Sequence, residues 1–73
     1  MTTYIFERDG GTLSTDNVKQ IIKAAGYDPA SLSYTDEGPH QVKAAGVEVM
    51  APSRLEHAAK QLGYKGTSVT VVD

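Results

Sequence analysis

Residues 18–27 read VKQIIKAAGY, and residues 55–64 read LEHAAKQLGY. In both segments apolar side chains occupy positions i, i+3, i+4 and i+7, a spacing that forms one apolar stripe along a helix. In each segment the apolar stripe is followed by a glycine, the residue that most readily takes the left-handed conformation past a helix end. The tyrosine that follows is expected to fold back on the last turn. The sequence therefore predicts two helices of one design, ending at Gly26 and Gly63.

The similarity extends beyond the helices, because the chain aligns with itself along most of its length when it is shifted by 37 positions. Asp16 and Ser53 fall on each other at the expected helix starts, and both are good N-cap residues. Ser53 followed by Glu56 also fits a capping box. We expect two repeat halves, residues 1–36 and 38–73, related by a pseudo-twofold axis.

Strand-like segments rich in β-branched and aromatic residues flank both predicted helices. The break in alternation between Ala44 and Val47 predicts a bulge near Ala45 and Gly46. The strands are expected at residues 3–8, 31–35, 41–50 and 68–72. The resulting βαββαβ order predicts a single domain over residues 1–73 of the α+β class: a two-layer ferredoxin-like sandwich with helices on one sheet face.

The two faces of the first strand are ambiguous, because a one-residue slip exchanges them. Either Ile5 points inward and Tyr4 and Phe6 face solvent, or the reverse holds. The repeat alignment places Ile5 on Val42 and so favours Ile5 inward, whereas Phe6 is the only phenylalanine and favours the opposite. Leu32, Tyr34, Val69 and Val71 are expected on the helix side.

Composition restricts the function classes. The chain has 73 residues and no cysteine, so its core is expected to hold by packing alone, and a homodimer stays open. The net charge of −2 argues against a nucleic-acid partner, because phosphate binding calls for a basic surplus. No apolar run reaches the roughly 18 residues of a membrane span, and no signal peptide is evident. We expect a cytoplasmic protein with no membrane partner.

Candidate chemistry is sparse. The glycine-containing loop Asp9–Thr12 lies between a strand and a helix, where such loops can cradle phosphate, but it lacks a dinucleotide or P-loop pattern. Asp36, Glu37 and His40 share one turn without a further metal ligand, and His57 lacks a partner histidine at helical spacing. A flexible connection, a solvated turn and an exposed helix face explain these features. The sequence predicts no catalytic residue, cofactor or metal.

We expect a small non-enzymatic protein-interaction domain, of the kind with which phages and mobile elements inhibit larger complexes. The expected contact is the sheet face away from the helices, with Tyr4, Phe6, Lys43 and Glu48 as protein-binding residues. Two alternatives stay open. One is a nucleic-acid-binding domain that uses the open sheet face, although the third strand has no aromatic residue for base stacking. The other is a small enzyme or ligand carrier that uses the Asp9–Thr12 loop.

Overall fold

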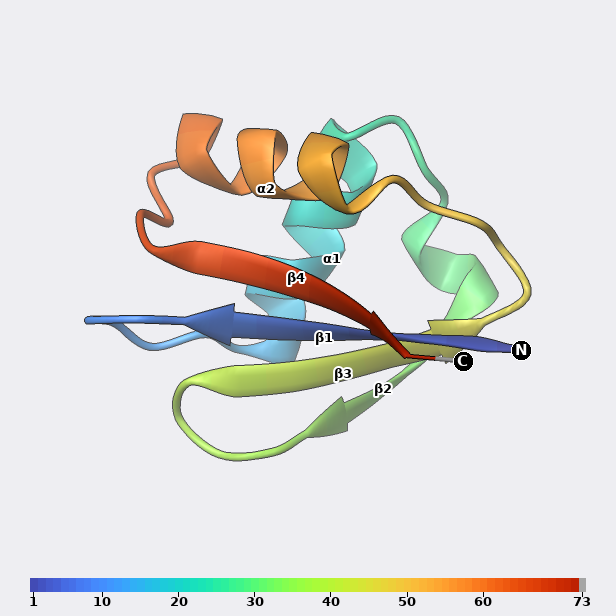
Figure 1. The fold of residues 1–73 in the computed structure, drawn as a ribbon, viewed down its shortest axis with the longest axis horizontal. Helices are drawn as coiled ribbons and strands as arrows, with labels where there is room; N and C mark the ends of the chain where they lie inside the picture. The colour runs from blue at the N-terminus through green and yellow to red at the C-terminus, as the bar shows by residue number, and fades with distance from the viewer. Residues whose placement is uncertain (73) are drawn as a thin grey trace.

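The computed structural model describes residues 1–72, and Asp73, the repeat counterpart of Asp36, lies outside the described residues. Its elements are β1 (Thr2–Arg8), α1 (Thr15–Ala24), the 3₁₀ turn η1 (Pro29–Ser31), β2 (Leu32–Asp36), β3 (Gln41–Gly46), α2 (Pro52–Gln61) and β4 (Thr67–Val72). The strands form one antiparallel sheet in the order β2-β3-β1-β4. Both helices cover the same face of this sheet (Figure 1). The predicted α+β, ferredoxin-like two-layer arrangement is confirmed.

The two helices end in the same way, as the repeat predicts. Gly26 and Gly63 have φ values of 95° and 91°. The amides of Tyr27 and Tyr64 donate to the carbonyls of Ile22 and Ala59, at 3.0 and 2.9 Å, as a Schellman motif requires. Both helices therefore stop at a glycine for the same conformational reason.

Each of these two tyrosines also reaches the start of the other helix. Tyr27 Oη accepts a hydrogen bond from the amide of Ala51 (3.0 Å), and the Arg54 guanidinium lies over the Tyr27 ring. Tyr64 Oη accepts from Asn17 Nδ2 at 3.0 Å. Asn17 and Arg54 are 37 positions apart, so the repeat places equivalent residues against equivalent tyrosines. The pseudo-twofold axis thus relates two equivalent contacts, in which the end of each helix is bonded to the start of the other.

The helix starts differ from the prediction. Ser14, not Asp16, is the N-cap of α1, where it forms a capping box with Asn17. The N-cap of α2 is Ala51, with Pro52 at the first helical turn and no side-chain cap. Ser53 therefore lies inside the helix, and the carboxylate of Glu56 binds the amide of Val69 in β4 instead.

The expected orientation of β1 is wrong. Tyr4 and Phe6 face the helices and are 1% and 0% exposed, whereas Ile5 lies opposite Lys43 on the open face. The reason is a one-residue difference between the halves. Phe6 precedes Val18 by 12 positions, whereas Ala44, the corresponding inward residue of β3, precedes Leu55 by 11. The 37-residue shift that aligns the two helices therefore aligns inward residues of one preceding strand with outward residues of the other.

The third strand is shorter than predicted and has no bulge. Its register with β1 and β2 is continuous to Gly46, where β3 ends. A Cβ at Gly46 would lie 2.7 Å from the Leu32 side chain, so close packing explains the glycine. Val47–Ala51 is a loop that leads to α2. Within residues 1–72, neither helix is long and apolar enough to cross a membrane.

Candidate functional site

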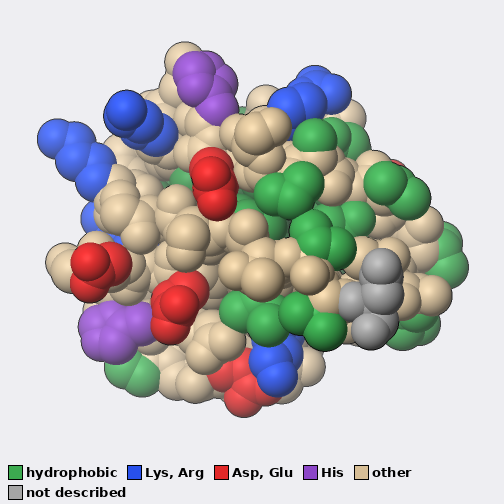
Figure 2. Space-filling view, viewed as in Figure 1, with side chains coloured by type: hydrophobic (Ala, Val, Ile, Leu, Met, Phe, Trp, Pro, Cys, Tyr) green, Lys and Arg blue, Asp and Glu red, His purple; other side chains and the backbone are tan. Residues whose placement is uncertain are grey.

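Exposed aliphatic side chains gather at the end of the molecule where both termini lie. Thr2 pairs with Gly46 and Thr3 with Val72, so the start of β1, the exit of β3 and the end of β4 meet there. We call this surface the apolar tip. Its residues, with their exposed fractions, are Met1 (89%), Val47 (81%), Val49 (81%), Val71 (40%) and Val72 (46%). Figure 2 shows hydrophobic side chains at this end and several charged side chains at the opposite end.

The loop that carries Val47 and Val49 is held by side chains of the fold. Tyr4 Oη donates to the Glu48 carbonyl (3.1 Å) and accepts from the Met50 amide (2.7 Å). Met50 is buried, while Val47 and Val49 are exposed. This alternation is typical of an extended segment that presents every second side chain outward. Val47 and Val49 therefore project outward from a backbone segment that the Tyr4 hydroxyl holds in place.

Two acidic side chains lie next to the tip. Glu48 Oε2 accepts from the amide of Asp28 at 3.3 Å, so two carboxylates lie beside Val47 and Val49. The pKa of Tyr34 is raised, first by burial and then by the negative charges of Asp28 and Glu48. The tip thus combines apolar contact area with a negatively charged flank.

Of the four residues predicted to bind protein, Tyr4 and Phe6 are buried and cannot contact a partner directly. Lys43 lies on the open sheet face, where it forms an ion pair with Glu37 at 3.3 Å. Glu48 is not in a strand but in the loop between the two exposed valines. The structure therefore separates Lys43 from Glu48 and leaves Lys43 as the one member of the predicted set on the open sheet face.

Sequence reasoning missed Val47 and Val49 because it assigned them to a strand that continued to Met50. The signal was present in the break of alternation after Ala44, which marks the end of the strand. A loop with two valines separated by one acidic residue is unusual, because loops favour polar and turn-forming residues.

The Asp9–Thr12 loop is occupied by intramolecular contacts. Arg8 donates to the carbonyls of Thr12 and Lys65, both at 3.1 Å, and the amide of Asp9 donates to Gly66. A Cβ at Gly11 would lie 2.7 Å from the Arg8 guanidinium. A phosphate site needs free amides that converge on the anion. Here backbone carbonyls bind the Arg8 guanidinium, so the loop contacts a cationic side chain of the same chain.

His40 lies beside this loop rather than with Asp36 and Glu37. Its Nδ1 donates to the carbonyl of Gly11, and it lines a hollow of about 370 Å³ together with Glu7 and Asp9. Across the described residues, no group of three His, Cys, Asp or Glu side chains is placed to hold a metal ion.

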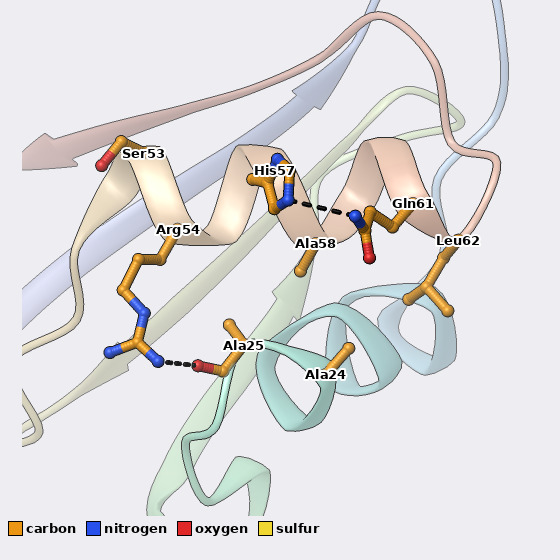
Figure 3. A pocket seen from close by; sticks show the side chains of 8 residues that line it. All are labelled: Ala24, Ala25, Ser53, Arg54, His57, Ala58, Gln61 and Leu62. Atoms are coloured by element: carbon orange, nitrogen blue, oxygen red, sulfur yellow. Dashed lines mark hydrogen bonds between the residues drawn. The ribbon is translucent and has the colours of Figure 1, made fainter.

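A groove of about 440 Å³ lies between the C-terminal end of α1 and the exposed side of α2 (Figure 3). Ala24, Ala25 and Ala58 leave this space because their side chains are small. The polar groups at its rim bind within the chain: Arg54 donates to the Ala25 carbonyl (2.9 Å), and Gln61 donates to His57 (3.1 Å). Arg54 and Gln61 therefore have hydrogen-bond partners within the protein.

A second groove, of about 520 Å³, lies between α2 and the start of β4. Glu56, Lys60, Lys65 and Thr67 line it. Within it, Glu56 Oε2 accepts a hydrogen bond of 2.9 Å from the Val69 amide, which is on the outer edge of the sheet. An edge strand, two lysines and the carboxylate that binds this strand therefore lie together at the groove.

Comparisons of this chain with protein-family models, with curated proteins and with solved structures gave no match.

Proposed function

We propose that this protein is a small non-enzymatic interaction domain that docks onto a larger protein through the apolar tip. The observation that carries the proposal is the exposure of Val47 and Val49 on a loop fixed by Tyr4. Burying one such side chain is worth about 1.5–3 kcal/mol, so several of them supply a useful part of a binding energy. A cluster of exposed aliphatic residues is a common mark of a protein interface.

The charges select the kind of partner. Asp28 and Glu48 beside the tip repel an anionic lipid surface or a nucleic acid and attract basic side chains. We therefore propose a partner with an apolar hollow and a basic rim. Inhibition of a larger complex, of the kind known from phages and mobile elements, and a cytoplasmic location remain predictions within this proposal. The absence of cysteine agrees with such a location.

The test compares variants of the tip with a variant elsewhere. The double variant V47S/V49S removes apolar area from exposed positions and should leave the free energy of unfolding nearly unchanged. The variant L62S makes a similar change at the C-cap of α2, away from the tip. In pull-downs from the native host, we expect one protein to be retained by wild type and L62S and lost by V47S/V49S. Equal retention by all three would contradict the proposal.

A further inference from the structure

We propose that the outer edge of β4 accepts an extended segment of the partner as an added strand, with an acidic end of that segment at Lys60 and Lys65 and an apolar end at the apolar tip. This inference rests on the proposed function and names the binding mode and the chemistry of the partner. It concerns the groove between α2 and the start of β4. The exposed Val71 and Val72 of the tip lie at the other end of the same strand.

Within residues 1–72, β4 pairs only with β1, so its other side faces no strand. The Val69 amide points away from β1, since it donates to Glu56, and alternation directs the backbone groups of Thr67 and Val71 the same way. Residues 67–72 read TSVTVV, without charge or proline. Such an edge is a template for an incoming strand. The other edge, β2, is shorter and ends in Asp36.

Glu56 of α2 reaches the open side of β4. Its carboxylate oxygen occupies the place on the Val69 amide that the carbonyl of an added strand would take. The side chain belongs to an exposed residue of α2, so it can turn into solvent when a strand arrives. Glu56 therefore protects the edge in the free protein, and it competes with the partner for one hydrogen bond.

The groove places α2 beside the start of the open edge. Extended peptides bind in such grooves in several domain types, where main-chain hydrogen bonds supply affinity and pockets supply selectivity. The volume of about 520 Å³ offers room for side chains of an added strand beside α2.

The charges give the segment its polarity along the groove. Lys60 and Lys65 lie near the start of β4, and the exposed Val71 and Val72 lie at its end. A segment with acidic residues at one end and alternating apolar residues at the other is complementary to both.

The test uses peptides and backbone NMR of the full chain. The probes are acetyl-Glu-Glu-Thr-Val-Thr-Val-amide and the reversed acetyl-Val-Thr-Val-Thr-Glu-Glu-amide, one for each strand direction, and the same two peptides with lysine in place of glutamate. We expect one acidic peptide to shift the amides of Val69 and Val71 and to leave those of Leu32 and Tyr34 unchanged. Its affinity should exceed that of the lysine peptide of the same order at least fivefold.

Variants complete the test. E56A should strengthen binding several-fold, whereas the matched control E37A, which removes a carboxylate at the far edge of the sheet, should not. K60E/K65E should reverse the preference between the acidic and basic peptides. Failure of all peptides to perturb β4, equal affinity for both charges, or weaker binding by E56A would each overturn the inference. If the native partner is lost with V47S/V49S but kept with K60E/K65E, the tip proposal stands and the edge proposal falls.

Discussion

At the scale of single residues, Tyr4 has two structural roles. Its ring belongs to the core under the helices, and its hydroxyl holds the loop at Glu48 and Met50. A buried phenol needs hydrogen-bond partners, and a loop without regular structure needs partners for its backbone groups. The same side chain satisfies both needs. The position of the exposed valines therefore depends on a residue that is itself almost fully buried.

We predict that Tyr4→Phe lowers the free energy of unfolding by about 1–3 kcal/mol, because the buried Met50 amide loses its partner. Urea denaturation measures this change. Tyr64→Phe, whose hydroxyl bonds to Gln20 and Asn17 near the surface, should cost less. An unchanged midpoint for Tyr4→Phe would show that its hydroxyl does not hold the loop.

Tyr34 gives a second prediction at this scale, on pH. Burial and the charges of Asp28 and Glu48 raise its pKa above the usual value of 10.0 in the folded state. The folded protein therefore keeps the Tyr34 hydroxyl proton to a higher pH than the unfolded chain does. The resulting stabilisation is complete below pH 10 and is lost as the pH rises through the folded pKa. We expect stability to fall less steeply above pH 10 in Tyr34→Phe than in wild type; parallel curves would contradict this.

At the scale of elements, the helix ends are the most regular feature of the repeat. Gly26 and Gly63 allow the positive φ that the Schellman motif needs, and a Cβ at Gly63 would meet no other atom within 4 Å. A substitution at Gly63 therefore reports the backbone conformation alone. At Gly26 the Arg54 side chain is near and would have to shift.

We predict that Gly63→Ala costs about 1 kcal/mol of stability, because alanine is strained at positive φ. Gly63→Asn should cost less, since asparagine tolerates this conformation better. Thermal unfolding of the two variants provides the measurement. An alanine variant as stable as the asparagine variant would remove the conformational explanation of the repeat.

The orientation of β1 gives a further prediction at this scale. Phe6→Ala should cost about 3 kcal/mol or more, which is enough to unfold much of so small a domain, because Phe6 is fully buried. Ile5→Ala should cost clearly less, because Ile5 lies on the open face beside Lys43 and Thr70. Circular dichroism during denaturation separates the two cases. Equal losses would contradict the assignment of faces.

The helices were predictable because the two stripes and their glycines carry the same local signal twice. Which face of β1 is buried could not be predicted, because it depends on whether the connection from β1 to α1 has one residue more or one fewer. Glu56 shows a similar limit: its spacing from Ser53 fits a cap, but the approach of β4 gives it a different donor. The apolar tip was missed because it arises where three strand ends meet, and only the tertiary fold brings them together.

At the scale of the whole molecule, the described chain measures 29 × 23 × 18 Å, and its exposed aliphatic residues lie mainly at one end. Serine or threonine at Val47 and Val49 would improve solubility at little cost to the core, since both side chains point outward. Exposed aliphatic residues lower solubility, and a binding surface is a common reason for a protein to have them.

The most direct test of docking through the apolar tip is site-specific photo-crosslinking in the native host. A photoreactive phenylalanine analogue replaces Val49 in one variant, Thr35 on the open sheet face in a second, and Leu62 at the end of α2 in a third. We predict that the probe at position 49 crosslinks to one larger protein, while the other two give little product. Crosslinking to that protein mainly from position 35 or 62 would contradict the central claim.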